Sequence, residues 1–241
     1  YLLNKKGFDN LVFFPYGDSL SLFADWSIQL WAESLGKKFN IEKIVDIGAN
    51  DGYFASQSSL VFSQEPYYCF EPISTVFASL QSRFVQRPNY HFFNCALGLE
   101  DGHTFINVNN YSPSSSLLEM EDIHKRIFVE TAESNKQRIK ICPLDSFLSA
   151  IEPNSQTLIK IDVQGYELQV IKGGSEFIKK CKVLIIEMSF ERLYREQPLF
   201  HEVYSTLHSM GFDYHGNVEQ LCNRETGEIL QADSFFVNRE V

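Results

Sequence analysis

Features typical of membrane and secreted proteins are missing from this sequence. Its 241 residues include no apolar run that approaches the roughly 20 residues needed to span a bilayer. The chain does not open on a basic segment followed by an apolar one, so nothing signals secretion. The five cysteines stand singly, none in a C-x-x-C pair, and four lie in or beside apolar runs, where a free cysteine acts as a small core side chain. We therefore expect a soluble, reduced protein in the cytoplasm.

Positive charge is also scarce, with 21 Lys and Arg against 31 Asp and Glu and a formal net charge of -10. Proteins that bind nucleic acid or an anionic membrane surface usually carry a dense stripe of Lys and Arg. The sequence has no such stripe, so we expect neither partner. By contrast, the hydrophobic fraction of 44% is ordinary for a folded protein and excludes wholesale disorder. The length fits one α/β domain with at most a small appendage.

Apolar runs typical of strands alternate with stretches typical of helices along most of the chain. This alternation predicts βαβ units, and therefore a parallel sheet with helices on both faces. One of these strands is expected over 91–98, followed by an antiparallel piece over 103–109. The last two strands, over 212–216 and 233–240, lack a helix long enough for a parallel crossover, so we expect an antiparallel pair at the sheet edge. The predicted fold class is α/β, with a Rossmann-like, mostly parallel sheet and an antiparallel C-terminal edge.

Two segments depart from the regular alternation. Residues 1–40 contain one helix-like stretch over 19–35, in which apolar and aromatic residues recur at helical spacing. Residues 109–137 hold a run of serines and then a polar, helix-like stretch. We therefore divide the chain into an N-terminal helical segment, 1–40, and a core, 41–241, that carries 109–137 as an insert.

The sharpest local signal is a glycine-rich turn, VDIGANDG, after the first buried strand. Gly48 and Gly52 let the backbone turn tightly and leave room for a ligand beyond the carboxyl end of the strand. Asn50 occupies the second glycine position of the dinucleotide pattern G-x-G-x-x-G, and Gly52 comes one residue early, which disfavours a pyrophosphate site. Asp46 and Asp51 would also repel phosphates and would suit a cationic ligand. A tight turn without any ligand is the alternative.

Glu71 ends the second strand, about 20 residues past this turn. An acidic residue at that place can accept hydrogen bonds from both ribose hydroxyls of a nucleoside. A solvated carboxylate at a strand end is the alternative, but the glycine turn at this distance favours the ribose contact.

Several motifs together resemble the FkbM family of S-adenosylmethionine-dependent methyltransferases: VDIGANDGYFA, FEP, NCALG, LDSFL, IKIDVQGYELQVIKGG and the closing FFVNRE. The resemblance runs from about Ile44 to Arg239, and the combination of IGANDG with IKIDVQGYE is far more specific than either motif alone. It implies a class I methyltransferase sheet of seven strands, with the last pair antiparallel, and transfer of a methyl group, usually to a hydroxyl oxygen. Gln164 departs from the pattern, because the family commonly carries Glu there. No role for that carboxylate can be transferred to this chain.

The resemblance also implies a site for S-adenosylmethionine beyond the strand ends. By position, Gly48, Asn50 and Gly52 would form the cofactor turn, Asp46 would lie near the methionine amino group, Glu71 would hold the ribose, and Asn94 and Ala96 would border the adenine. For Asn94, a turn residue that only hydrogen-bonds the backbone is the alternative.

Three side chains are candidates for removing the proton of the acceptor hydroxyl. Asp162 ends the fourth strand, beside the expected reversal of strand order, so it could hold the cofactor amine, act as the base, or merely cap the next helix. Glu187 ends the fifth strand and is expected to face the same crevice. His124 lies in the insert, where it could act as a base near neutral pH or be a surface side chain. Asp162 and Glu187 could instead hold Mg²⁺, but no third ligand is evident, so we expect no metal.

These observations predict an S-adenosylmethionine-dependent O-methyltransferase. Its acceptor would be a hydroxyl of a small molecule, of a sugar, or of a polyketide or peptide intermediate bound to a carrier protein, as in natural product biosynthesis. The chain could then be one domain of a polyketide synthase or of another multidomain protein. The N-terminal helix and the insert would form the acceptor walls, or the helix would only cover the sheet edge. Two alternatives stay open: a non-catalytic cofactor-binding or docking domain of a multienzyme, and a nicotinamide-dependent oxidoreductase.

Overall fold

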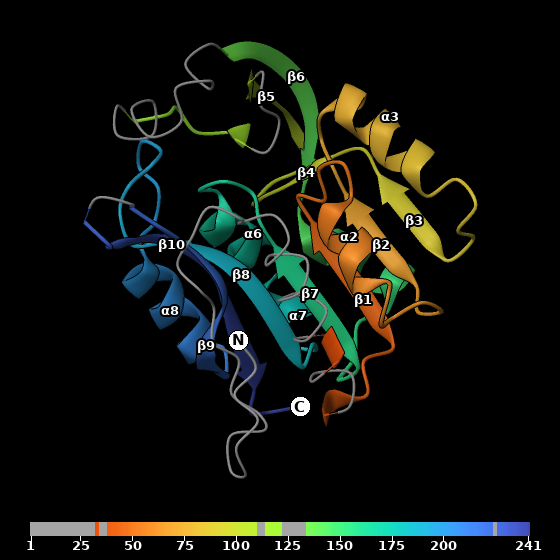
Figure 1. Cartoon of the computed structure of the whole chain (residues 1–241). Coiled ribbons are helices and arrows are strands. Elements are labelled where there is room, and N and C mark those ends of the chain that lie inside the picture. Colours follow the sequence, from red (N-terminus) through yellow and green to blue (C-terminus); the bar gives the residue numbers. More distant parts are fainter. Residues whose placement is uncertain (1–31, 34–37, 110–113, 122–133, 224–225) are drawn as a thin grey trace, which may run out of the picture.

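The structure of the chain is a computed structural model, shown in Figure 1, that describes residues 32–33, 38–109, 114–121, 134–223 and 226–241. Most of the helix expected over 19–35 and most of the insert expected over 109–137 therefore lie outside the described residues. Within the described part of the chain, no helix is both long enough and apolar enough to cross a bilayer.

A seven-stranded sheet forms the centre of the molecule, in the order β3-β2-β1-β7-β8-β10-β9. The first five strands of this order are parallel, and β10 pairs antiparallel with both β8 and β9. The predicted Rossmann-like sheet with an antiparallel C-terminal edge is thus confirmed. The strands are β1 Lys43–Ile47, β2 Tyr67–Phe70, β3 Tyr90–Phe93, β7 Thr157–Ile161, β8 Val183–Ser189, β9 Phe212–Cys222 and β10 Ile229–Asn238.

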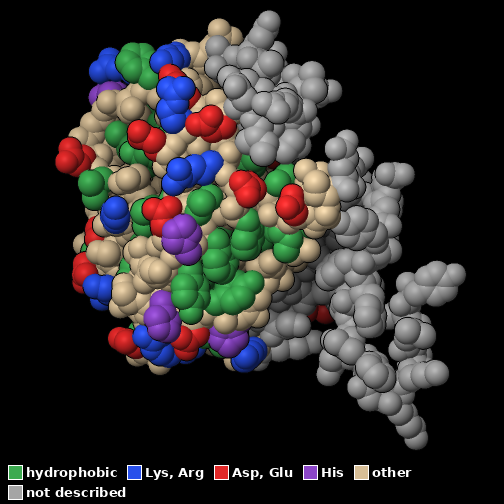
Figure 2. All heavy atoms as spheres, turned by 90° about the vertical axis from the view of Figure 1, so that its left-hand side faces the viewer, with side chains coloured by type: hydrophobic (Ala, Val, Ile, Leu, Met, Phe, Trp, Pro, Cys, Tyr) green, Lys and Arg blue, Asp and Glu red, His purple; other side chains and the backbone are tan. Residues whose placement is uncertain are grey.

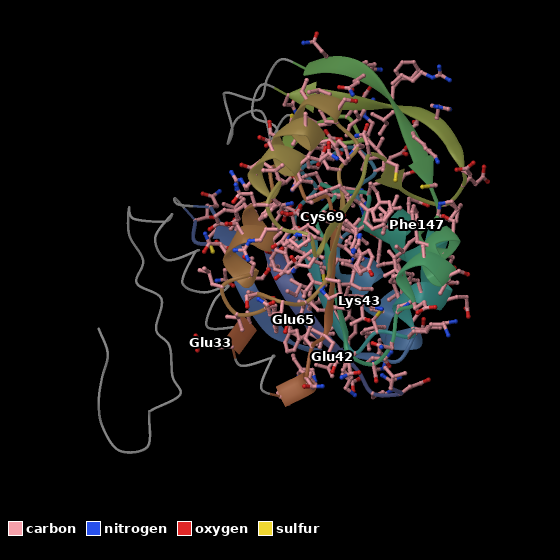
Figure 3. The ribbon with its side chains drawn as sticks, turned by 90° about the vertical axis from the view of Figure 1, so that its right-hand side faces the viewer. Glu33, Glu42, Lys43, Glu65, Cys69 and Phe147 are labelled. Carbon is pink, nitrogen blue, oxygen red and sulfur yellow. The ribbon has the colours of Figure 1, made fainter. Side chains whose placement is uncertain are left out.

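Helices cover both faces of this sheet, because its central strands are apolar on both sides. On one face, Cys69 of β2 lies in a core with residues of α2 and of the α3 region. On the other face, Phe147 packs on the core formed with α6, α7 and α8, and Figure 3 shows both side chains from the β3 edge of the sheet. The helices are α2 Tyr53–Ser58, α3 Ser74–Arg83, η3 Leu144–Phe147, α5 Leu148–Ile151, α6 Glu167–Gly173, α7 Ser175–Ile178 and α8 Phe200–Ser209.

Aromatic contacts fix α8 on the C-terminal strands. The rings of Phe200 and Tyr214 meet edge to face at 5.7 Å, and Tyr214 meets Phe236 of β10 at 5.5 Å. Edge-to-face pairs of this kind stabilise a contact beyond the burial of their area. Figure 2 shows the hydrophobic side chains that gather on this side of the molecule.

A second, three-stranded sheet stands beside the carboxyl ends of the main sheet, in the order β4-β6-β5. Its strands are β4 Ala96–Leu97, β5 Gly102–Asn109 and β6 Ser134–Cys142, so the last residues assigned to the insert belong to β6. The antiparallel piece expected over 103–109 is confirmed as β5, which pairs with β6. The single strand expected over 91–98 is wrong, because it divides into β3 and β4. The amide of Asn94 donates to the carbonyls of Glu71 and Pro72, and the chain leaves the main sheet there.

We predict that Gly173→Ala destabilises the fold, because α6 and the small sheet meet at this residue without a side chain between them. A Cβ atom on Gly173 would lie 1.9 Å from the carbonyl oxygen of Gly98. Alanine normally stabilises a helix relative to glycine, so a loss here would report the close approach. We expect a loss of about 1–3 kcal/mol, visible as a melting temperature lower by roughly 2–10 °C.

Gly102→Ala is the matched control, because a Cβ atom on Gly102 would meet nothing within 4 Å. Equal melting temperatures for the two variants would contradict the proposed contact between α6 and β4.

Candidate active site

A pocket of about 270 Å³ opens beyond the carboxyl ends of the parallel strands, where β1 and β7 lie side by side. The chain runs outward from β1 to β3 on one side of this point and from β7 to β8 on the other. In open α/β sheets, ligands bind at such a reversal of strand order. The lining residues come from the turn after β1, the end of β2, the small sheet, the 114–121 segment and the ends of β7 and β8: Ile47, Gly48, Asn50, Phe70, Glu71, Pro72, Ile73, Cys95, Ala96, Leu97, Ile106, Ser115, Leu117, Asp162, Val163, Gln164, Tyr166 and Glu187.

The turn after β1 is pressed against the end of β7. Gly48 has a φ of +79°, and a Cβ atom there would lie 1.8 Å from the carbonyl oxygen of Asp162, so only glycine fits. Gly48 and Asn50 line the pocket. Gly52, in contrast, lies behind the turn, where a Cβ atom would meet the ring of Phe84 at 2.4 Å. Gly52 therefore shapes the turn through its packing and does not line the pocket.

Glu71 connects the end of β2 with the glycine turn and is only 5% exposed. Its Oε2 atom accepts the backbone N–H of Asn50 at 3.1 Å, and its Oε1 atom accepts that of Ile73 at 2.7 Å. Burial raises the pKa of Glu71 to about 7 although both hydrogen bonds oppose the rise. Each carboxylate oxygen has a second lone pair, so Glu71 can still accept a hydrogen bond from a molecule in the pocket.

The other acidic residues of the turn point away from the pocket. Asp46 is 1% exposed, and among the described residues its Oδ2 atom has no hydrogen-bond partner. It lies opposite Lys160 in the pairing of β1 with β7, and burial raises the pKa of Asp46 to about 7 against the attraction of that lysine. Asp51 forms an exposed ion pair with Arg83 at 2.7 Å. Successive side chains of a strand point to opposite faces of the sheet. Because Ile47 lines the pocket, the preceding residue, Asp46, lies on the opposite face.

The two residues expected beside the adenine separate. Ala96 lines the pocket from β4. Asn94 is exposed, is not among the lining residues, and uses its amide to bind the backbone after β2. Its contact is the backbone role named above as the alternative.

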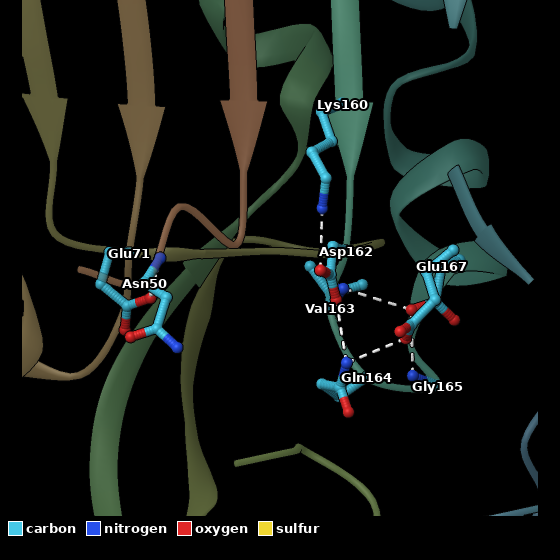
Figure 4. Close-up of polar contacts among 9 residues, drawn as sticks. Asn50, Glu71, Lys160, Asp162, Val163, Gln164, Gly165 and Glu167 are labelled. Atoms are coloured by element: carbon cyan, nitrogen blue, oxygen red, sulfur yellow. Dashed lines mark hydrogen bonds and ion pairs between the residues drawn. The ribbon is translucent and has the colours of Figure 1, made fainter. Parts of the chain in front are cut away.

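Asp162 and Glu187 both line the pocket, and one amide joins them. The Nε2 atom of Gln164 donates to Oδ1 of Asp162 at 2.9 Å and to Oε2 of Glu187 at 2.9 Å. Oδ2 of Asp162 also accepts a hydrogen bond from the ammonium of Lys160 at 2.8 Å, which Figure 4 shows beside the amide contact. Gln164, noted in the sequence only as a departure from the family pattern, is therefore at the centre of the acidic side of the pocket.

The surroundings of these two carboxylates differ. The Asp162 carboxylate forms an ion pair with Lys160. Burial, followed by repulsion from Asp162, Glu167 and Asp233, raises the pKa of Glu187 well above its ordinary value. Two carboxylates in contrasting surroundings can take different chemical roles.

Sequence reasoning missed several other residues near the site. Lys160 carried a signal, since a lysine inside the apolar strand TLIKI is unusual unless it is paired. Tyr194 carried none, although its buried hydroxyl donates to Oε1 of Gln164 at 2.8 Å. Ser115 and Leu117 show that part of the insert reaches the pocket, whereas His124 lies outside the described residues. Among the residues that the structure describes, no group of three His, Cys, Asp or Glu side chains could hold a metal ion.

Comparison of the sequence with known protein families shows which family has these motifs. Residues 46–214 match the Methyltransferase FkbM domain. The chain belongs to the FkbM methyltransferase family. Members of this family use S-adenosylmethionine, which favours a methyltransferase over the nicotinamide-dependent alternative.

Individual proteins resemble the chain at lower similarity. Methyltransferase 1 of Beauveria bassiana is 26% identical over 183 residues, covering 65% of this chain and 72% of its own length. The 2-O-methyltransferase NoeI of Sinorhizobium fredii is 26% identical over 161 residues, covering 64% of this chain and 66% of NoeI, just under two thirds. The crystal structure of magnesium protoporphyrin IX methyltransferase from Synechocystis shares the fold, with a TM-score of 0.50, 11% identity, and coverage of 92% of this chain and 87% of that one.

The chemistry of the pocket fits the cofactor of the family. Gly48, which has no side chain, borders the pocket. Among the described residues, those that line the pocket include three carboxylates and no Lys, Arg or His, which suits a ligand that carries an amino group and a positively charged sulfonium. Ala96, Leu97 and Ile73 add a small, apolar wall of the kind that accepts a flat ring.

We predict that Glu167→Gln flattens the dependence of the unfolding free energy on pH. Burial raises the pKa of Glu167 from 4.5 to about 7, while its Oε1 atom accepts the backbone N–H groups of Val163 and Gly165. Its contribution to stability is therefore complete below pH 4.5 and is lost as the pH rises to about 7. Glutamine keeps the acceptor oxygen and cannot ionise. As the pH rises from 4.5 to about 7, the unfolding free energy of the variant should therefore increase by on the order of 1–3 kcal/mol relative to that of the native chain.

Urea denaturation at several pH values measures this difference. Glu176→Gln, a change of an exposed carboxylate on α7, is the control and should follow the native curve. A Glu167→Gln curve parallel to the native one would show that Glu167 ionises normally in the folded state.

Proposed function

We propose that this chain is an O-methyltransferase that transfers a methyl group from S-adenosylmethionine to a hydroxyl of a small molecule, a sugar or an intermediate bound to a carrier protein. The observation that carries the proposal is the meeting of the glycine turn, Glu71 and the Asp162–Glu187 pair in one pocket. The relative named a 2-O-methyltransferase supports transfer to oxygen. The cofactor would supply a methyl group already activated on a sulfonium.

In this proposal the cofactor lies along the turn side of the pocket. Gly48 and Asn50 would approach it through their backbone, and Glu71 would accept the ribose hydroxyls with its remaining lone pairs. Ala96 and Leu97 of the small sheet would border the adenine. Asp162, held in an ion pair with Lys160, would face the positive end of the cofactor.

Glu187 is the better candidate for the base. Each oxygen of Asp162 already accepts a hydrogen bond, Oδ2 from Lys160 and Oδ1 from Gln164, whereas among the described residues Oε1 of Glu187 accepts none. Burial raises the pKa of Glu187, and a raised carboxylate pKa matches it better to a proton of an acceptor hydroxyl. The acceptor would enter beside Ser115 and Leu117 of the insert and Ile106 of β5, which line the same pocket.

The cofactor half of the proposal is tested with S-adenosylhomocysteine, the demethylated product. We expect calorimetry to show binding to the native chain and an affinity at least about tenfold weaker for Glu71→Gln, because hydrogen bonds to a charged group contribute roughly 1.5–3 kcal/mol. Glu100→Gln changes an exposed carboxylate outside the pocket and should bind normally. A native chain that binds no S-adenosylhomocysteine would refute the proposed function.

The catalytic half is tested with a panel of hydroxylated small molecules, saccharides and carrier-bound substrates, using S-adenosylmethionine with a deuterated methyl group. Mass spectrometry should find the label on an oxygen of one class of acceptor. Glu187→Gln should lower turnover by about 100-fold or more, the usual contribution of a general base, while S-adenosylhomocysteine still binds. Unchanged turnover in that variant would remove Glu187 from the mechanism.

A further inference from the structure

Gln164 occupies the place where the family pattern commonly has Glu, and the fold holds it firmly. Its backbone has a φ of 53°, in the left-handed region, and Gly165 follows with a φ of 99°. The hydroxyl of Ser116 donates to the carbonyl of Gln164 at 2.6 Å. Because Ser116 lies in the described part of the insert, the loop after β7 and the acceptor side of the pocket are connected through Gln164.

The orientation of the Gln164 amide is fixed by its neighbours. Tyr194, which is fully buried, donates its hydroxyl to Oε1 at 2.8 Å. The two hydrogens on Nε2 point to Asp162 and Glu187. A reversed amide would place Oε1 against two carboxylates, so only one orientation is compatible with its surroundings.

Gln164 forms a clamp through its hydrogen bonds with Tyr194, Asp162 and Glu187. Within this clamp the two carboxylates accept different numbers of hydrogen bonds. Each oxygen of Asp162 already accepts one hydrogen bond, Oδ2 from Lys160 and Oδ1 from Gln164. Glu187 gives Oε2 to Gln164, and among the described residues its Oε1 atom accepts no hydrogen bond. Since Glu187 lines the pocket, Oε1 is the oxygen left for an incoming hydroxyl.

We propose that Gln164 is a positioning residue that holds Asp162 and Glu187 apart as two aligned acceptors and directs Oε1 of Glu187 to the acceptor hydroxyl. This inference rests on the proposed function. A glutamate at the same place would put a third negative charge between the two carboxylates, whereas the glutamine gives each of them a donor. Tyr194 and Ser116 support the clamp, so an acceptor bound against the insert would be aligned with Glu187 by the same contacts.

The test compares the affinities of S-adenosylmethionine and S-adenosylhomocysteine, because only the first carries the sulfonium charge. Their ratio should report the negative charge that faces the sulfonium, and it should fall as the pH is lowered and Glu187 takes up a proton. The charged groups that interact electrostatically with one or both members of the pair are Lys160 of β7, Glu167 of α6, Asp233 of β10 and Asp46 of β1. All of them stay unchanged in the variants compared.

Gln164→Met keeps the length of the side chain and removes both donors, and Gln164→Glu adds a charge. We expect the midpoint of the affinity ratio, measured between about pH 5.5 and 8.5, to move up by about one pH unit or more in both variants, because each change disfavours the ionised pair. Gln86→Glu, the same chemical change at an exposed site after α3, should leave the midpoint unchanged. Tyr194→Phe should move it in the same direction by a smaller amount.

The outcomes separate this inference from the proposed function. A native chain that binds neither compound refutes the proposed function itself. Binding with a ratio that does not change with pH, or with the same midpoint in the native chain and in Gln164→Met, overturns the role of Gln164. A lower melting temperature in Gln164→Met without a shifted midpoint would reduce Gln164 to a structural residue.

Discussion

The contact between the glycine turn and the end of β7 is the constraint on which the pocket depends. Gly48 lies so close to the carbonyl oxygen of Asp162 that no side chain fits between them. This bare backbone contact brings the turn after β1, with Asn50 and the carboxylate of Glu71, beside the loop that carries Asp162 and Gln164. The two halves of the site are thus joined by the packing of two adjacent parallel strands.

The pocket also depends on several acidic side chains that are buried in the fold. Glu71, Asp46 and Glu167 are nearly inaccessible to solvent, and burial raises the pKa of each to about 7. Lys160 interacts with Asp46 and forms an ion pair with Asp162. A cationic ligand would compensate a further part of this charge, so the family cofactor matches an electrostatic need of the folded chain. Lys160 pairs with Asp162, whereas Glu187, which also lines the pocket, has no such ion pair among the described residues.

Local signals predicted much of the fold and part of the site. Strand and helix patterns gave the parallel sheet with its antiparallel edge, because hydrophobic periodicity reflects which faces are buried. The break within 91–98 was missed, since it depends on the contact of Asn94 with the backbone after β2, 22 or 23 residues away. Glu71, Asp162 and Glu187 were found as carboxylates at the ends of apolar strands. Asp46 was expected to face the pocket. That expectation overlooked the alternation of side chains along a strand, which places Asp46 on the side opposite to Ile47.

The sequence by itself determined the order of the strands and helices, the glycine turn and the acidic strand ends, because these depend on residue type and short-range spacing. Only the tertiary structure decided which of the acidic side chains share one pocket, that the small sheet closes it, and that Gln164 joins Asp162 to Glu187. Such features depend on the register between strands far apart in the chain and on partners such as Tyr194, 30 residues from Gln164. Pairings over these distances leave no periodic trace in the sequence.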